Sequence, residues 1–85
     1  MARKMKNLYE CSFKQLYTYR NMYYQEILEG SIEFPWALFM LLDHPKFIKE
    51  PEKQRRMDLK KIFNQMDSKY LNSIFIDVNE LEVIE

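Results

Sequence analysis

Residues 5–28, which decide the fold of this chain, read MKNLYECSFKQLYTYRNMYYQEIL. Apolar and aromatic side chains recur there at helical spacing, and no glycine or proline interrupts them before Gly30. The pattern predicts one long helix over about residues 4–29, ended by Gly30 in the left-handed conformation. Its apolar band covers roughly 200° of the helical wheel, about twice the width of an ordinary packed face. We therefore expect this helix to contact two layers, or one layer and another molecule.

A second helix is predicted over residues 31–43, with Ser31 as its N-cap and Pro35 in its first turn. The segment from Phe34 to Leu42 is apolar on all sides of such a helix. A helix of that kind is normally buried, so we expect it to be the innermost element.

The rest of the chain predicts one more helix and an extended tail. Residues 45–50 are expected to form a connector, and apolar side chains at 3–4 spacing predict a third helix over residues 51–70. The tail, 73–84, alternates apolar and polar residues, which favours strand, with residues 77–80 as a hairpin loop. A short helix over 78–85 is the alternative. The predicted fold is mainly α: a three-helix irregular bundle with a C-terminal extended or β-hairpin segment, in a single domain of residues 1–85.

Charge is distributed unevenly along the 85 residues, although the formal net charge is zero. Residues 1–61 carry 12 Lys and Arg against 8 Asp and Glu, giving +4, and residues 62–85 carry one Lys against five acids, giving −4. Such a layout favours head-to-tail association, or an acidic partner on the basic side. The alternative is that the two halves neutralise each other inside one fold.

The number of cysteines and the hydropathy of the chain indicate the cellular compartment. Cys11 is the single cysteine, so no intrachain disulfide can form, and we expect a cytoplasmic protein. The longest apolar run, Phe34 to Leu42, is about half a membrane span, so no membrane segment is expected. The abundance of Phe, Tyr, Met, Ile, Asn and Lys favours an AT-rich genome, such as those of many low-GC bacteria, phages and mobile elements.

Catalytic chemistry has little support in this sequence. Cys11 and His44 form no recognisable nucleophile–base signature, and one glycine, Gly30, excludes the standard Gly-rich phosphate loops. No Cys pair or His-x3-His spacing suggests a metal site. We therefore expect a protein that is not an enzyme and that uses no cofactor or metal.

The strongest candidate contacts lie in the first helix. Arg20 falls inside its aromatic band, and Arg and Tyr are both enriched in binding hot spots. Arg20, Tyr17, Tyr19 and Tyr24 are therefore the predicted partner-binding residues. The alternative for Arg20 is a structural one, in which its stem covers the core while its head reaches solvent or an acid.

The sequence thus favours a non-enzymatic protein-binding module of the inhibitor, immunity or adaptor type. Its partner would be another protein, or a second copy that closes the aromatic band in a homodimer. One alternative is nucleic-acid binding through Lys53, Arg56 and Lys60, which lie at 3 and 4 spacing on the third helix. Another alternative is a structural subunit of a larger assembly.

Overall fold

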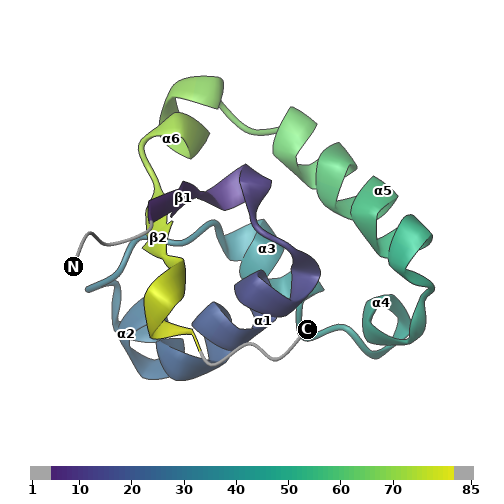
Figure 1. The fold of residues 1–85 in the computed structure, drawn as a ribbon, viewed down its shortest axis with the longest axis horizontal. Helices are drawn as coiled ribbons and strands as arrows, with labels where there is room; N and C mark the ends of the chain where they lie inside the picture. The colour runs from purple at the N-terminus through teal and green to yellow at the C-terminus, as the bar shows by residue number, and fades with distance from the viewer. Residues whose placement is uncertain (1–4, 82–85) are drawn as a thin grey trace.

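Six short α-helices and a two-stranded antiparallel sheet make up the computed structural model, which describes residues 5–81 (Figure 1). In chain order the elements are β1 (Met5–Asn7), the 3₁₀ helix η1 (Leu8–Glu10), α1 (Phe13–Met22), α2 (Tyr24–Glu29), α3 (Trp36–Leu41), α4 (Pro45–Lys49), α5 (Glu52–Asn64), α6 (Ser68–Asn72), β2 (Phe75–Asp77) and the 3₁₀ helix η2 (Val78–Glu80). The predicted class, mainly α with an extended C-terminal segment, is confirmed, although the described residues form more and shorter helices than the three expected.

The predicted helix over 4–29 is wrong at its start and is interrupted near its end. Ser12 caps α1 in a capping box: its Oγ accepts a hydrogen bond from the Gln15 N–H at 3.2 Å, and its own N–H donates to Gln15 Oε1 at 3.0 Å. The helix therefore begins at Phe13. Tyr23, with φ −111° and ψ 25°, leaves the helical conformation and separates α1 from α2. Gly30 ends α2 at φ 81°, as predicted.

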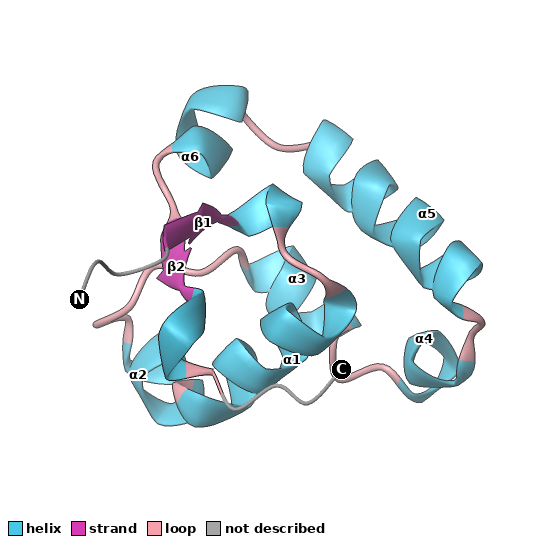
Figure 2. Cartoon of the chain, viewed as in Figure 1, coloured by secondary structure: helices cyan, strands magenta, loops and turns pink. Residues whose placement is uncertain are grey.

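Residues 5–10, which the sequence predicts as part of the first helix, form the strand β1 and the 3₁₀ helix η1 instead. β1 pairs antiparallel with β2, with Lys6 opposite Ile76, so the extended tail finds its partner at the other end of the chain (Figure 2). Asn7, which is buried, ties this pair to α6 by donating from Nδ2 to the Leu71 carbonyl at 3.1 Å. The predicted loop at 77–80 is the helix η2, which Asp77 caps by accepting from the Asn79 N–H.

The other predicted helices are also divided. The helix expected over 31–43 is confined to α3, because Pro35 is its N-cap and the Ser31 hydroxyl donates to the Glu26 carbonyl instead of capping. The connector expected at 45–50 forms α4. The helix expected over 51–70 stops at Asn64, and α6 begins after Asp67, whose carboxylate accepts from the Lys69 N–H.

The core lies among β2, η1, α1, α3 and the turn after α3. Among the described residues, the five largest fully buried side chains are Leu8, Leu16, Leu38, Leu42 and Ile76. Burying each such side chain stabilises the fold by about 1.5–3 kcal/mol. α5 runs along one flank of this body, between α4 and α6 (Figure 1). Of its thirteen residues Leu59 alone is buried and Phe63 packs partly against the core, whereas α1 contributes the buried Leu16 together with Phe13, Tyr17 and Tyr19.

Candidate protein-binding site

Arg20 lies inside the molecule, with 3% of its surface exposed. Its Nε donates to the Phe39 carbonyl at 3.1 Å, its Nη1 donates to Asn21 Oδ1 at 2.9 Å, and its Nη2 lies 3.3 Å from Asp43 Oδ1. All three nitrogens of the guanidinium therefore have partners within the chain. The geometry matches the structural alternative for Arg20, in which the head meets an acid, and it leaves no free face for direct contact with a partner.

An aromatic cluster is built on this buried guanidinium. Its central carbon lies 4.4 Å from the ring centroid of Phe39 and 5.0 Å from that of Tyr24. Trp36 stacks on Phe39 with centroids 5.0 Å apart and an interplanar angle of 9°, and Tyr24 also contacts Phe39, at 5.2 Å. Phe39 is thus the buried centre that joins Arg20 on α1, Tyr24 on α2 and Trp36 on α3.

Three side chains of this region are open to solvent: Tyr24 is 42% exposed, Trp36 57% and Met40 58%. Met40 lies one helical turn after Trp36, so both side chains project from the same face of α3. We call Tyr24, Trp36 and Met40, together with the buried Phe39 beneath them, the aromatic surface. The second predicted helix is therefore not enclosed on all sides, because one face of α3 has no covering layer in the described residues.

The predicted tyrosines are divided between this surface and the core. Tyr24 belongs to the aromatic surface, but Tyr17 and Tyr19 are half-buried and pack against the core. Tyr17 contacts Phe13 with ring centroids 5.6 Å apart, and Tyr19 stacks on Phe34 at 5.9 Å. Burial, and secondly the charge of Glu80, raises the pKa of Tyr19, as expected for a hydroxyl that has lost part of its water. The structure therefore does not bring the four predicted residues together on one exposed face.

Trp36 and Met40 are the surface residues that sequence reasoning missed. A signal for them was present, because the segment 34–42 is apolar on every side and an 85-residue chain has too few elements to cover a helix all round. Their i, i+4 spacing then marks one face of that helix as the exposed one.

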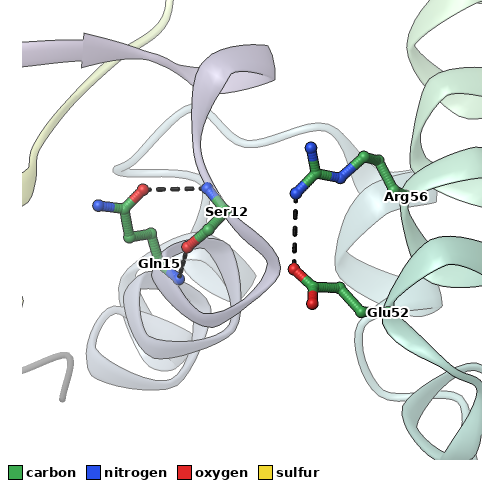
Figure 3. A network of polar contacts seen from close by, with 4 residues as sticks. All are labelled: Ser12, Gln15, Glu52 and Arg56. Carbon is green, nitrogen blue, oxygen red and sulfur yellow. Dashed lines mark hydrogen bonds and ion pairs between the residues drawn. The ribbon is translucent and has the colours of Figure 1, made fainter. Parts of the chain in front are cut away.

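The predicted basic residues on α5 are all exposed but differ in their surroundings. Arg56 pairs with Glu52 on the same helix at 3.5 Å, and both side chains are more than 70% exposed. This pair stands opposite the capping box of α1 (Figure 3). Arg56 and Lys60 line a cavity of about 340 Å³ between α5 and the N-terminal segment, whereas Lys53 does not line it. The nucleic-acid role of these residues remains a prediction.

Cys11 and His44 each have a local structural role. The buried Cys11 thiol donates to the Asn7 carbonyl at 3.5 Å, and burial raises its pKa to about 11, which keeps it a protonated thiol and a poor nucleophile. His44 caps α4, with Nδ1 accepting from the Lys46 N–H at 3.2 Å. Within residues 5–81, no group of three or more His, Cys, Asp or Glu side chains is placed to hold a metal ion.

Over the same residues, no helix has the length and apolar character needed to cross a membrane. Comparisons of the chain with protein-family models, curated proteins and solved structures found no match.

Proposed function

We propose that this protein is a non-enzymatic protein-binding module that docks another protein on its aromatic surface. The observation that carries the proposal is Trp36, which is 57% exposed yet held flat against Phe39. Tryptophan and tyrosine are enriched among the residues that dominate binding energy, and Met is enriched at interfaces. Isolated exposed hydrophobics are ordinary, but here two exposed aromatic side chains, Trp36 and Tyr24, contact a single buried ring.

The support beneath the surface strengthens the proposal. Binding costs free energy when flexible side chains must be ordered, and that cost falls when they are already fixed. Phe39 is fixed through its carbonyl, which accepts from Arg20 Nε, and through its ring, which lies against the same guanidinium. Trp36 and Tyr24 both contact this ring. Arg20 is therefore a positioning residue, and a partner would meet rings that are already in place.

The partner that fits this surface is a protein with an apolar pocket for the Trp36 indole. Blocking a partner's surface requires only shape and apolar contact, as in proteins of the inhibitor, immunity or adaptor type. The cation beneath the aromatic surface, Arg20, is already paired with Asp43 at 3.3 Å. We therefore expect affinity to depend weakly on salt.

The test is affinity capture from a lysate of the source organism, followed by titration of the captured protein with purified variants. Trp36→Ala should weaken binding by about 2 kcal/mol or more, as for a hot-spot residue, and Tyr24→Ala by less. Met57→Ala is the matched control, because Met57 is 48% exposed but lies on α5. Equal affinities for Trp36→Ala and Met57→Ala, with both variants folded by circular dichroism, would refute the proposal.

A second copy of the chain is the competing occupant of the same surface. Light scattering on the purified protein separates the two cases. A monomer that captures a different protein supports the proposal, whereas a dimer that Trp36→Ala converts to a monomer assigns the surface to self-association.

A further inference from the structure

A groove runs along α5 on the side that faces the N-terminal segment. It consists of two adjoining hollows of about 340 Å³ and 690 Å³, which share Tyr9, Lys60 and Phe63. The first hollow extends toward Cys11 and Glu52, and the second toward α6. We call the two together the α5 groove. It is separate from the aromatic surface, which is formed by α2 and α3.

The lining of the α5 groove combines apolar and polar residues. Leu59 and Phe63 come from α5, Leu71 comes from α6, and Met66 comes from the turn between these helices, beside polar residues such as Asn64 and Ser68. Leu59 and Leu71 are buried, whereas Tyr9, which lines both hollows, is 47% exposed. The volumes fall within the range of binding sites in proteins, roughly 300–1,000 Å³. The groove follows a helix of thirteen residues, about 20 Å long, so it fits an elongated segment better than a compact small molecule.

The charges around the groove favour an anionic occupant. Within residues 5–81 its lining contains the cations Lys6, Arg55, Arg56 and Lys60 against the acids Glu10 and Glu52, which gives +2. In the hollow next to α6, Lys60 is the one charged residue among the described residues of the lining. An occupant with carboxylates near Lys60 and apolar groups over Tyr9 and Phe63 would therefore be complementary to both hollows.

We propose that the α5 groove binds an acidic amphipathic helix of a partner protein. The apolar stripe of such a helix would lie against Tyr9 and Phe63, which line both hollows, and its carboxylates would meet Lys60 and Lys6. This is the helix-in-groove mode of recognition, in which side chains at i, i+3, i+4 and i+7 supply the anchors. Nucleic acid fits less well, because the net charge of the lining is small for binding a phosphate backbone and Arg56 is already paired with Glu52 at 3.5 Å.

The probe is a synthetic peptide of about 15 residues with leucines at i, i+3, i+4 and i+7 and glutamates between them. Binding to the full chain is followed by the fluorescence anisotropy of a dye on the peptide. The acidic peptide should bind, and the same peptide with lysines in place of glutamates should not. Lys60→Glu should weaken binding at least about tenfold, because it reverses the charge in the middle of the groove. Tyr9→Ala should weaken binding by removing an exposed ring from the wall.

Lys53→Glu is the matched control, since it makes the same charge change on an exposed residue of α5 that does not line the groove. It should change affinity less than about twofold. Equal losses in Lys53→Glu and Lys60→Glu would show a general attraction to α5 and overturn the proposal. Equal binding of the acidic and basic peptides would also overturn it.

Trp36, the single tryptophan of the chain, reports on the other surface. Saturation with the unlabelled acidic peptide should leave its emission unchanged, and Trp36→Ala should bind the peptide normally. Loss of peptide binding in Trp36→Ala would place the peptide on the aromatic surface and overturn the groove. Binding of a single-stranded oligonucleotide but not the peptide would assign the groove to nucleic acid, and self-association abolished by Lys60→Glu would assign it to a second copy. Failure of the aromatic surface to capture a partner would leave these groove measurements unaffected.

Discussion

The aromatic surface and the α5 groove are built in opposite ways. On α3, Leu38 and Phe39 are buried, and the exposed Trp36 rests on a ring that a hydrogen-bonded arginine holds from below. On α5, which is twice as long, Leu59 alone is buried and the exposed side chains stand over a hollow. The aromatic surface is therefore a closely packed set of rings, whereas the α5 groove is an open hollow.

This difference follows from how few apolar side chains a short chain can gather. A small domain buries a smaller share of its surface than a large one, so some helices remain attached by a single row of contacts. Regions with few buried apolar contacts open at lower free energy than the core. We therefore expect the body around α1 and α3 to be the stable unit, and α5 to be the element that a ligand in the groove would stabilise.

The largest expected effect tests whether the body around α1 and α3 is more firmly packed than α5. Leu16→Ala removes a fully buried side chain from α1 and should lower the free energy of unfolding by about 2–5 kcal/mol. Leu59→Ala makes the same change on α5, where the side chain already borders an open cavity. Its cost should be about 2 kcal/mol or less, because truncation there enlarges a hollow that water can enter. Urea unfolding measures both, and equal losses would mean that α5 is as firmly packed as α1.

The second prediction concerns the support of the aromatic surface. Arg20→Met keeps a long apolar stem but leaves the Phe39 carbonyl without its donor, so it should cost about 2–3 kcal/mol. The fluorescence anisotropy of Trp36 should fall as well, because the ring beneath it loses its cation.

Asp43→Asn is the control for this prediction. The Asp43 side chain is 69% exposed, so weakening its ion pair with Arg20 should cost less than about 1 kcal/mol. If Asp43→Asn were as damaging as Arg20→Met, the ion pair and not the buried hydrogen bond would hold the surface.

Several features of the fold were accessible from sequence because they depend on local chemistry. The helical class, the left-handed Gly30 and the start of a helix after Pro51 follow from periodicity and from glycine and proline geometry. The capping pair Ser12 and Gln15 was also readable, since Ser-x-x-Gln is a start signal, yet the apolar band on either side obscured it.

Other features depend on contacts far apart in the chain. No glycine or proline marks the break at Tyr23, whose hydroxyl donates to Glu80 at 2.8 Å across more than fifty residues. β1 is only three residues long and pairs with a strand at the opposite end of the sequence. Periodicity cannot reveal a strand so short or a partner so distant.

The location of the candidate site could not be predicted from the sequence. A helical wheel gives only the width of an apolar band and not which part of it a neighbour covers, and the wheel was drawn for one continuous helix that the described residues do not form. Tyr17 and Tyr19 are half-buried against the core, while Trp36 and Met40 are 57% and 58% exposed. Arg20 took a carbonyl and a carboxylate from the α3 region, and no pattern within the first helix shows those partners.

The third prediction concerns how the stability of the fold changes at alkaline pH, where the Cys11 thiol titrates. Burial raises the pKa of Cys11 from 9.0 to about 11; the charge of Lys6 opposes this shift and that of Glu10 adds to it. Because the folded pKa lies above the unfolded one, the stability linked to the protonated thiol is complete below pH 9 and is lost as pH rises toward 11. The loss should be on the order of 2 kcal/mol.

Cys11→Ser tests this dependence of stability on pH, because a serine hydroxyl does not titrate in this range. The hydroxyl can still donate to the Asn7 carbonyl. Urea unfolding at pH 9 and at pH 11 should show a smaller fall in stability for the variant than for the parent. Identical falls would mean that other groups, such as Tyr70 with its raised pKa of about 12, dominate the alkaline response.

The smallest expected effect separates stability from binding in the α5 groove. Glu52→Gln removes an exposed ion pair between residues at i and i+4, which should change the free energy of unfolding by no more than about 0.5 kcal/mol. It also frees Arg56 and raises the net charge of the groove lining from +2 to +3. An acidic peptide should therefore bind severalfold more tightly at low salt, and the gain should vanish at high salt.

A matched titration with Glu29→Gln, an exposed acid at the end of α2 that lines neither hollow, should show no gain. If Glu29→Gln improved binding as much as Glu52→Gln, the peptide would be responding to the net charge of the whole chain. The charge of the α5 groove would then not distinguish it from the aromatic surface on α3 as a binding site.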